Sequence, residues 1–463
     1  MATATTSAVR LPPGPRLPKL VQLAVFLAAR DRAIAAVQRR YGTSVTVRLP
    51  GFDNLVVVSD PALVKEVFVS GGDLLGEGAN LGQVLGPGST FSLDGDAHLQ
   101  RRKLLVPPFH GRRIRAYERI VEEEVLRECA DWPDGTEFAT LPSMMRITLN
   151  AILRAVFGAE GEDFDELRQL LPAAVLFGSR MTTLPAAIRR DYGPWSLGGR
   201  LADYRCRYDA AVQRLIRNAL ADPALDTRAD ILALLLRARY EDGTRISDEH
   251  LADELLTLLT AGHETTATTL AWAIERLRRH PTLLDQLADD LDAGNSEMCQ
   301  ATIWEVQRTR PVIQAAVRSV KTRLQLGEWV IPEGSAIAVA IGMAHTSENN
   351  FAWANSFDPT RFLHERPNTH AWIPFGGGVR RCVGAAFANM EMNVVLRTLF
   401  REFTLVPTSA PDERKQSRGV AVAPGHGGLA VVYRKRSATV AVTSPDHSVA
   451  HLAPLRSPDF GVS

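Results

Sequence analysis

The most regular apolar pattern of the chain runs from Ser247 to Arg279. Ser247 is a favoured N-cap residue, two acidic residues follow it, and Pro281 marks the end of the pattern. A helix of roughly 32 residues, or about 48 Å, is therefore predicted. Apolar residues occupy much of its circumference, so we expect the helix to cross the interior of the protein. These positions are Leu255, Leu256, Leu258, Leu259, Leu270 and Trp272.

Shorter segments with alternating polarity predict strands on both sides of this helix. Residues 44–48 and 54–58 alternate as in a β-hairpin, and Pro61 stands at the favoured first position of a following helix. Residues 71–88 contain seven glycines, which predicts a mobile loop rather than a helix or strand. Further short strands are expected at 329–331, 336–341, 419–422 and 429–433.

Together these elements predict a mainly α fold with small β-sheets. No linker or internal repeat divides the chain, so a single large domain is expected over residues 11–435. Residues 1–10 are expected to form a flexible N-terminus. From residue 436 onward the composition shifts to Ser, Pro, Thr and His without periodicity, which predicts a disordered tail over 436–463.

Composition narrows the class of protein without naming it. The 463 residues are 45% hydrophobic and 23% charged, with a net charge of +1, as in ordinary globular proteins. This balance gives no reason to expect nucleic-acid binding. No early apolar run approaches the ~20 residues that span a bilayer, so no transmembrane segment is expected. The four cysteines are far apart and form no CxxC pair, which favours a reducing cytoplasm.

The strongest chemical signal is a glycine-rich loop that ends in a cysteine. Residues 376–378 are all glycine, Cys382 follows, and an apolar helical pattern begins behind it. Three glycines allow a tight loop beneath a flat ligand. A cysteine at a helix N-terminus faces the positive end of the helix dipole, which favours the thiolate, the form that binds metals. A buried structural cysteine beside a turn is the alternative for a cysteine considered alone.

The full ten-residue segment resembles the haem-binding signature F-x-x-G-x-R-x-C-x-G of the cytochrome P450 superfamily. Its fixed positions are filled by Phe375, Gly378, Arg380, Cys382 and Gly384. The resemblance covers residues 11–435 and is closest to soluble bacterial, actinobacterial members. It implies the cytochrome P450 fold around a buried haem b, so that 11–435 would be the catalytic domain. It also implies that Cys382 is the axial ligand of the haem iron and that Arg380 pairs with a haem propionate.

A second motif lies midway along the long predicted helix, at residues 261–266. The small pair Ala261–Gly262 allows a bulky ligand to lie against the helix. By resemblance, Glu264 and Thr265 are the acid–alcohol pair that delivers protons to the oxygen being activated. In the alternative interpretation, the threonines only bond to carbonyl groups one turn earlier.

Other cations and carboxylates take their expected roles from the same resemblance. Glu305 and Arg308, spaced as a helical i,i+3 pair, would otherwise form a surface ion pair worth ~0.2–0.5 kcal/mol. The family instead locks such a pair to a later arginine, here Arg361, as a structural clamp that positions the cysteine loop. Haem propionates need cationic partners. The resemblance suggests Arg102, His98 and Arg318, although each arginine could simply be a solvated surface residue.

The resemblance implies a monooxygenase that inserts one oxygen atom from O2 into a lipophilic small molecule. The segments expected to line the pocket are mostly apolar. Electrons would come from a ferredoxin-type donor and an NAD(P)H-dependent reductase. A basic cluster is expected to steer that donor, and its members are Arg101, Arg102, Lys103, Arg112, Arg113 and Arg115. The alternatives are a peroxide-driven haem-thiolate enzyme and a non-catalytic haem sensor or ligand carrier.

Overall fold

The computed structural model describes residues 2–78, 81–158, 161–182, 184 and 186–435. The fold is mainly helical. The α-helices are α1 (Lys19–Tyr41), α2 (Pro61–Val69), α3 (Gly82–Leu85), α4 (Gly95–Leu105), α5 (Arg112–Cys129), α6 (Leu141–Phe157), α7 (Glu162–Met181), α8 (Ala186–Arg189), α9 (Leu197–Ala221), α10 (Ile231–Arg237), α11 (Asp248–Arg278), α12 (Pro281–Asp292), α13 (Glu297–Thr309), α14 (Ile341–His345), α15 (Arg361–His364) and α16 (Ala385–Glu402).

The strands are short and gather into small sheets. Two 3₁₀ turns, η1 (Pro107–Phe109) and η2 (Gly378–Arg380), complete the elements. The strands are β1 (Thr3–Ala4), β2 (Ser44–Val47), β3 (Leu55–Val58), β4 (Leu75–Glu77), β5 (Phe138–Ala139), β6 (Ala315–Val320), β7 (Leu324–Leu326), β8 (Trp329–Ile331), β9 (Ala336–Ala340), β10 (Phe403–Leu405), β11 (Lys415–Ser417), β12 (Val422–Pro424), β13 (Leu429–Ala430) and β14 (Val432–Arg434).

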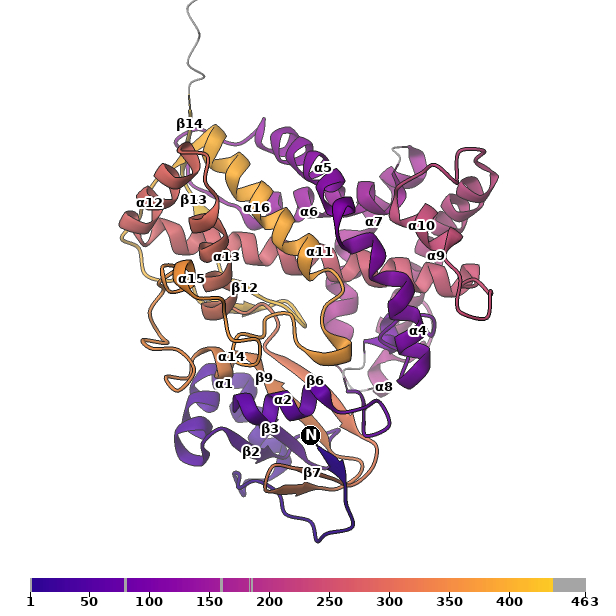
Figure 1. Ribbon diagram of the computed structural model, residues 1–463, viewed down its shortest axis with the longest axis vertical. Helices are drawn as coiled ribbons and strands as arrows, with labels where there is room; N and C mark the ends of the chain where they lie inside the picture. The colour runs from indigo at the N-terminus through magenta and orange to yellow at the C-terminus, as the bar shows by residue number, and fades with distance from the viewer. Residues whose placement is uncertain (1, 79–80, 159–160, 183, 185, 436–463) are drawn as a thin grey trace, which may run out of the picture.

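Helices and the main sheet occupy different parts of the molecule. Most of the helices surround α11 in one part, whereas β2, β3, β6, β7 and β9 lie with α1 and α2 in the other (Figure 1). The main sheet has the order β2-β3-β9-β6-β4. β4 and β6 are antiparallel, which sets Arg318 opposite Glu77 at one edge of the sheet. The sheet thereby carries two charged residues toward the region of the cysteine loop.

Helix α11 forms the centre of the helical part. The Ser247 side chain accepts a hydrogen bond from the His250 backbone N–H and begins the helix. Leu251 to Leu259 belong to one buried apolar cluster, and Ala267 to Leu277 belong to another. Burying one leucine side chain in such a cluster stabilises the fold by roughly 1.5–3 kcal/mol. Residues 260–266 belong to neither cluster, so the apolar core is interrupted at the middle of α11.

Most of the predicted elements are present with small shifts. The long helix, the hairpin of β2 and β3, and the helix that begins at Pro61 are confirmed. The glycine-rich segment 71–88 is not only loop, because it contains β4 and α3. Residues 418–421 form a turn and the strand begins later, at β12, while the expected strand 429–433 is split into β13 and β14.

The N-terminal segment differs from the expectation of flexibility. β1 pairs with β7, so that Thr3 lies opposite Gln325, and Arg10 bridges to Val330. The buried side chain of Ala2 completes this small sheet. The predicted tail 436–463 lies outside the described residues. Among the residues that are described, no helix is both long and apolar enough to cross a membrane.

Candidate functional site

The cysteine loop adopts a conformation that requires its glycines. Gly378 has a φ of +64°, in the left-handed region that other residues rarely adopt. A side chain at this position would collide with the backbone of Phe68, and one at Gly377 would collide with the Phe68 ring. The loop closes through a hydrogen bond from the Cys382 backbone N–H to the Phe375 carbonyl, at 2.9 Å.

The side chain of Cys382 is deep in the fold and yet open on one side. Burial raises the pKa of its thiol, against smaller opposing effects of the Gly384 backbone N–H, Arg381 and Arg102. The expected effect of the helix N-terminus on the thiol is thus outweighed by burial. The side chain is nevertheless exposed. A thiol that is surrounded by protein and still exposed faces an internal space, and a metal ion bound there would remove its proton.

A second open position occurs on α11. Ala261 is exposed although the neighbouring turns of this central helix are buried or half-buried, and the adjacent Gly262 is half-buried. A bulky flat group can therefore lie against the helix at the place where the apolar core is interrupted. Cys382 at the end of the cysteine loop and Ala261 on the central helix are thus both exposed, and these two open positions fit a large planar cofactor such as haem.

Four basic side chains converge near the cysteine loop. His98 and Arg102 lie on α4, Arg318 on β6 and Arg380 in η2. Burial and the positive charges of Arg380 and Arg102 lower the pKa of His98 to about 4, with a further small contribution from Arg318. The structure thus brings together all four propionate partners suggested by the sequence. His98 is neutral at neutral pH, so it could bind a carboxylate only as a hydrogen-bond donor.

The protein itself supplies some anions to this basic group. Arg380 donates to Glu77 at 3.2 Å and to the Leu93 carbonyl at 2.6 Å, and it also pairs with Asp94. Arg102 donates to the Arg381 carbonyl at 2.7 Å. A cavity of about 460 Å³ is lined by His98, Arg318 and Arg380 among others. A haem propionate in this region would compete with Glu77 and Asp94 for Arg380.

Glu264 and Thr265 lie on the open face of α11, and an arginine that the sequence analysis did not identify contacts Glu264. Nε of Arg418 donates to Oε1 of Glu264 at 3.0 Å. Burial raises the pKa of Glu264, against the opposing effects of Arg418 and Arg180. The Thr265 hydroxyl donates to the Ala261 carbonyl at 2.8 Å. The alternative interpretation expects this hydrogen bond to a carbonyl one turn earlier. The hydroxyl oxygen can still accept a hydrogen bond from another donor.

The neighbouring His263 is not a metal ligand in this arrangement. Its Nδ1 lies 3.1 Å from the Thr148 hydroxyl, and burial, with a contribution from Arg418, lowers its pKa to about 4. Among the described residues no cluster of His, Cys, Asp and Glu side chains could hold a metal ion.

The three predicted clamp residues meet in the core. Arg308 binds both carboxylate oxygens of Glu305 at 2.7 Å, and Arg361 approaches the same carboxylate at 3.3 Å. His345 connects the clamp to the cysteine loop: its Nδ1 lies 3.2 Å from the Arg308 carbonyl, and its Nε2 accepts from the Ile373 backbone N–H at 2.8 Å. This contact stands two residues before Phe375, so the clamp is placed to fix the start of the loop.

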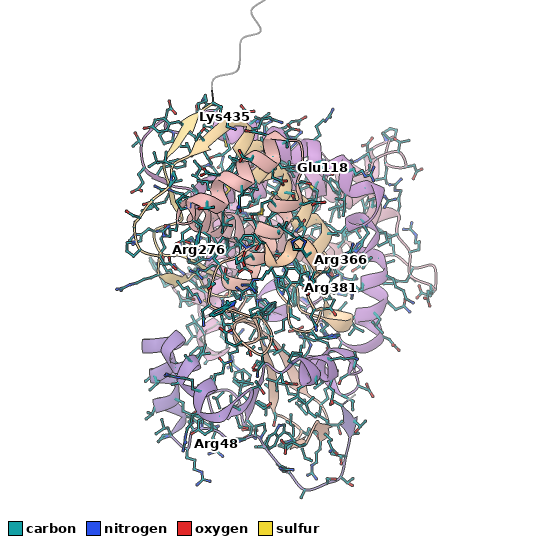
Figure 2. The ribbon with its side chains drawn as sticks, turned by 60° about the vertical axis from the view of Figure 1, so that its left-hand side comes forward. Arg48, Glu118, Arg276, Arg366, Arg381 and Lys435 are labelled. Carbon is teal, nitrogen blue, oxygen red and sulfur yellow. The ribbon has the colours of Figure 1, made fainter. Side chains whose placement is uncertain are left out.

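The predicted basic cluster is only partly a surface feature. Arg101 is buried and pairs with Glu254 at 2.9 Å, so it is unavailable to a partner protein, because its guanidinium serves the core instead. Lys103 is exposed but pairs with Glu241 at 2.6 Å. Arg113 and Arg115 are exposed. Arg381, at the end of the cysteine loop and labelled in Figure 2, is also exposed and was not included in the cluster.

Other residues at the site gave no signal in the sequence. Arg418, Glu77 and Asp94 are single charges far from their partners along the chain. Glu391 on α16 is fully buried, and neither of its carboxyl oxygens has a hydrogen-bond partner that meets ordinary geometry among the described residues. Burial raises the pKa of Glu391 well above its ordinary value, and the nearby Thr266 hydroxyl opposes this rise.

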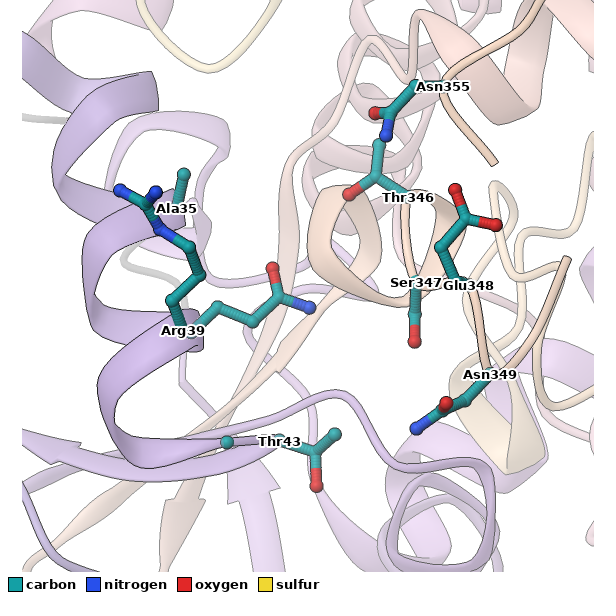
Figure 3. Close-up of a pocket in the computed structure, with 10 residues that line it drawn as sticks. Ala35, Arg39, Thr43, Thr346, Ser347, Glu348, Asn349 and Asn355 are labelled. Atoms are coloured by element: carbon teal, nitrogen blue, oxygen red, sulfur yellow. The ribbon is translucent and has the colours of Figure 1, made fainter. Parts of the chain in front are cut away.

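A second cavity, of about 430 Å³, contains none of the predicted site residues. Figure 3 shows Ala35 and Arg39 of α1 on one side of it and Thr346, Ser347 and Glu348 on the other. Its lining is mainly polar and carries no cysteine or metal-ligating cluster.

Comparisons with known proteins agree on one family. The family model described as "Cytochrome P450" matches residues 11–430. A Mycobacterium tuberculosis protein named for cytochrome P450 138 is 53% identical over 429 residues, which cover 92% of this chain and 97% of the relative. A Mycobacterium bovis protein named for cytochrome P450 135B1 is 38% identical over 436 residues, which cover 91% of each chain.

Solved structures share the fold at lower identity. A retinoic acid-bound cyanobacterial CYP120A1 has a TM-score of 0.80 and 23% identity, with 93% of this chain and 100% of that chain covered. The haem domain of cytochrome P450DA also has a TM-score of 0.80, with 22% identity and coverage of 93% and 98%. At these identities the likeness concerns the fold alone.

Proposed function

This chain belongs to the cytochrome P450 family and is therefore a monooxygenase with a haem-iron cofactor, and from that premise we propose the following roles for its residues. Residues 11–435 form the catalytic domain. The cofactor is haem b, which supplies the redox chemistry that activates O2. Cys382 would supply the thiolate that holds the haem iron, because it is the exposed thiol at the end of the glycine loop.

The basic group formed by His98, Arg102, Arg318 and Arg380 would hold the haem propionates. Burial, followed by the positive charges of Arg380 and Arg102, lowers the pKa of His98 to about 4. Two carboxylates would relieve this repulsion through charge-assisted hydrogen bonds. Phe375 and Gly384 complete the loop that holds the thiolate, and the Gly384 backbone N–H donates to the sulfur.

Protons reach the active site through Glu264 and Thr265. Burial raises the pKa of Glu264, which brings a carboxyl group closer to the pH at which it can both take and give a proton. Thr265 is one residue further along α11, and its hydroxyl oxygen can relay that proton by accepting and donating hydrogen bonds. Glu305, Arg308 and Arg361 are structural: they hold the segment before the cysteine loop.

The substrate is a lipophilic small molecule that lies against Ala261. The elements near this face supply apolar residues, among them Val312, Ala421 and Val422, all of them buried. On α7, Leu171 lies in the core and Phe177 packs on Tyr204 of α9, so these two side chains contribute less to the pocket. One structural relative, the cyanobacterial CYP120A1, is bound to retinoic acid.

Electrons come from a separate ferredoxin-type protein with an NAD(P)H-dependent reductase, and the enzyme works in the cytoplasm. Exposed arginines around the cysteine loop and α5 favour an acidic partner. They are Arg113, Arg115 and Arg381. Because this attraction is between exposed charges, turnover is expected to weaken as salt concentration rises.

The observation that carries this proposal is the single deep yet exposed thiol at the end of the glycine loop. The test replaces it: Cys382→Ser should abolish the thiolate signature in the ferrous carbonyl spectrum of purified protein. Cys206→Ser is the matched control, since Cys206 is an exposed thiol on α9 away from the loop. An unchanged spectrum in Cys382→Ser, or failure of the unaltered protein to take up haem, would overturn the assignment.

A further inference from the structure

Arg418 places a guanidinium group beside Glu264, within the proposed active site. It lies in the turn between β11 and β12, and its side chain is 28% exposed. Only its Nε is engaged, through the hydrogen bond to Glu264. Among the residues that the structure describes, neither Nη1 nor Nη2 of Arg418 has a hydrogen-bond partner. One edge of the guanidinium is therefore used, and the other remains available.

The backbone holds this arginine firmly in place. The Arg418 backbone N–H donates to the Ala421 carbonyl at 2.9 Å, which closes the turn. The Val420 backbone N–H donates to the Ser179 hydroxyl of α7 at 3.0 Å. Gly419 has a φ of +109°, and a side chain there would collide with Ser179. The turn is thus pressed against α7 and cannot carry a larger residue next to Arg418.

The following strand attaches the turn to the centre of the fold. Nε1 of Trp272, on α11, donates to the Val422 carbonyl at 3.0 Å, and the Val422 backbone N–H donates to the Val312 carbonyl at 3.0 Å. Figure 1 shows β12 beside α11. Because both ends of the turn are tied, the guanidinium is oriented before any ligand arrives, which reduces the entropy lost on binding.

The charged groups that face Arg418 come from α11 and α7. Glu264 uses the Nε edge, and His263, on the same helix, is neutral at neutral pH because burial lowers its pKa to about 4. Arg180 on α7 adds positive charge close enough to affect Glu264. The Glu264 carboxylate thus lies at the Nε edge of the guanidinium. Among the described residues, no contact occupies the fork formed by Nη1 and Nη2.

We propose that Arg418 is a specificity-determining residue that binds the carboxylate of an amphipathic, otherwise apolar acid through Nη1 and Nη2, while Nε stays on Glu264. This inference rests on the proposed function, since it names the substrate class of the same pocket. The planar fork of arginine matches the two oxygens of a carboxylate. Glu264 and Ala261 are three residues apart on α11 and so share a face, which places the apolar part of the acid beside Ala261.

The test compares a carboxylic acid with uncharged molecules of the same chain length. Decanoic acid, methyl decanoate and decan-1-ol are titrated into haem-loaded, full-length protein, and dissociation constants are measured by calorimetry and by the change in the haem absorption spectrum. The unaltered protein should bind the acid at least ~10-fold more tightly than the ester, a difference of about 1.4 kcal/mol. Hexadecanoic acid and its ester extend the comparison to a longer chain.

Variants separate the fork from the charge. Arg418→Gln should abolish the preference for the acid and change the affinity for the ester less than ~3-fold. Arg418→Lys should keep part of the preference, because the charge remains and the fork is lost. Glu264→Gln should keep or increase it, since a competing carboxylate is removed. Arg414→Gln, an exposed arginine on the same hairpin, is the matched control and should behave as the unaltered protein.

Equal binding of acid and ester by the unaltered protein overturns the inference, as does failure to bind either acid, or a preference that survives in Arg418→Gln. These outcomes are distinguishable from failure of the proposed function. If the protein takes up haem and Cys382→Ser alters its carbonyl spectrum, the family chemistry stands and only the substrate class is wrong. If no haem is taken up, the proposed function fails first.

Discussion

Two arginine–glutamate pairs in this protein differ in how fully the arginine is used. Arg308 binds both oxygens of Glu305 and donates to three backbone carbonyls, and both side chains are 0% exposed. Arg418 makes one hydrogen bond to Glu264, and the side chains are 28% and 8% exposed. The first pair has no capacity left for a ligand, whereas the second retains two donor groups.

The difference shows how one pair of residue types can serve two purposes. A buried ion pair is tolerated only when additional hydrogen bonds offset the loss of hydration, so Arg308 is surrounded by carbonyl groups. A partly exposed pair needs no such saturation, and its energy is small. Because every hydrogen-bond donor of Arg308 is used, the Arg308–Glu305 pair has a structural role. The unused donors of Arg418 indicate a binding role for the Arg418–Glu264 pair.

The largest effect is expected from breaking the Arg308–Glu305 pair, whose arginine donors are all used. Arg308→Met should lower the free energy of unfolding by about 3–5 kcal/mol, because Glu305 is left as a buried charge without its main partner. Haem content should fall as well, since the contact through His345 to Ile373 is weakened. Chemical denaturation and haem absorbance measure both quantities. A loss below ~1 kcal/mol would contradict a structural role, and Arg366→Met, at an exposed arginine, is the control.

The next effect concerns turnover rather than stability. Glu264→Gln should lower product formation about 100-fold in the presence of a ferredoxin and reductase, because a general acid–base group contributes 10²–10⁴-fold. Glu264→Asp keeps the carboxyl group and should recover part of the activity. The measurement is the steady-state rate over pH, with substrate affinity followed separately. An activity loss equal in both variants would assign Glu264 to structure instead.

A third carboxylate, that of Glu391, has no arginine partner among the residues that the structure describes. Its pKa is higher in the folded protein, so the folded state holds one more proton than the unfolded state above about pH 4.5. This group therefore makes the free energy of unfolding fall as pH rises, by up to about 1.4 kcal/mol per pH unit. Glu391→Gln should remove that slope, as urea denaturation from pH 5 to 8 can measure. Equal slopes for the two proteins would contradict burial of an ionisable group here.

The smallest effect is expected from breaking the Arg418–Glu264 pair, whose arginine donors are only partly used. Arg418→Gln should change the free energy of unfolding by less than ~1 kcal/mol, because a single hydrogen bond in a partly exposed ion pair is worth little. Arg414→Gln, on the same hairpin, is again the control. Thermal and urea denaturation give the comparison with Arg308→Met. A loss as large as that of Arg308→Met would show that Arg418 mainly supports the fold.

How much could be predicted from the sequence depended on how local each signal was. The long helix could be predicted because its cap and apolar positions are contiguous, and the cysteine loop because its glycines and Cys382 stand within ten residues. The prediction that 71–88 is only a loop is wrong, because β4 pairs with β6 in spite of the glycine content of this segment. The prediction that Arg101 belongs to a basic surface cluster is wrong. Its partner Glu254 is 153 residues away along the chain, so the sequence gives no sign of this buried pair.

The sequence by itself determined the family, the mainly helical fold and the loop that carries the reactive cysteine, since these depend on residues that are neighbours along the chain. Only the tertiary structure decided which charges are used up and which remain available. Arg418 and Glu264 are 154 residues apart, and Arg380 and Glu77 are 303 apart. Ion pairing depends on distance and exposure in the folded chain, and neither quantity is written in the order of residues.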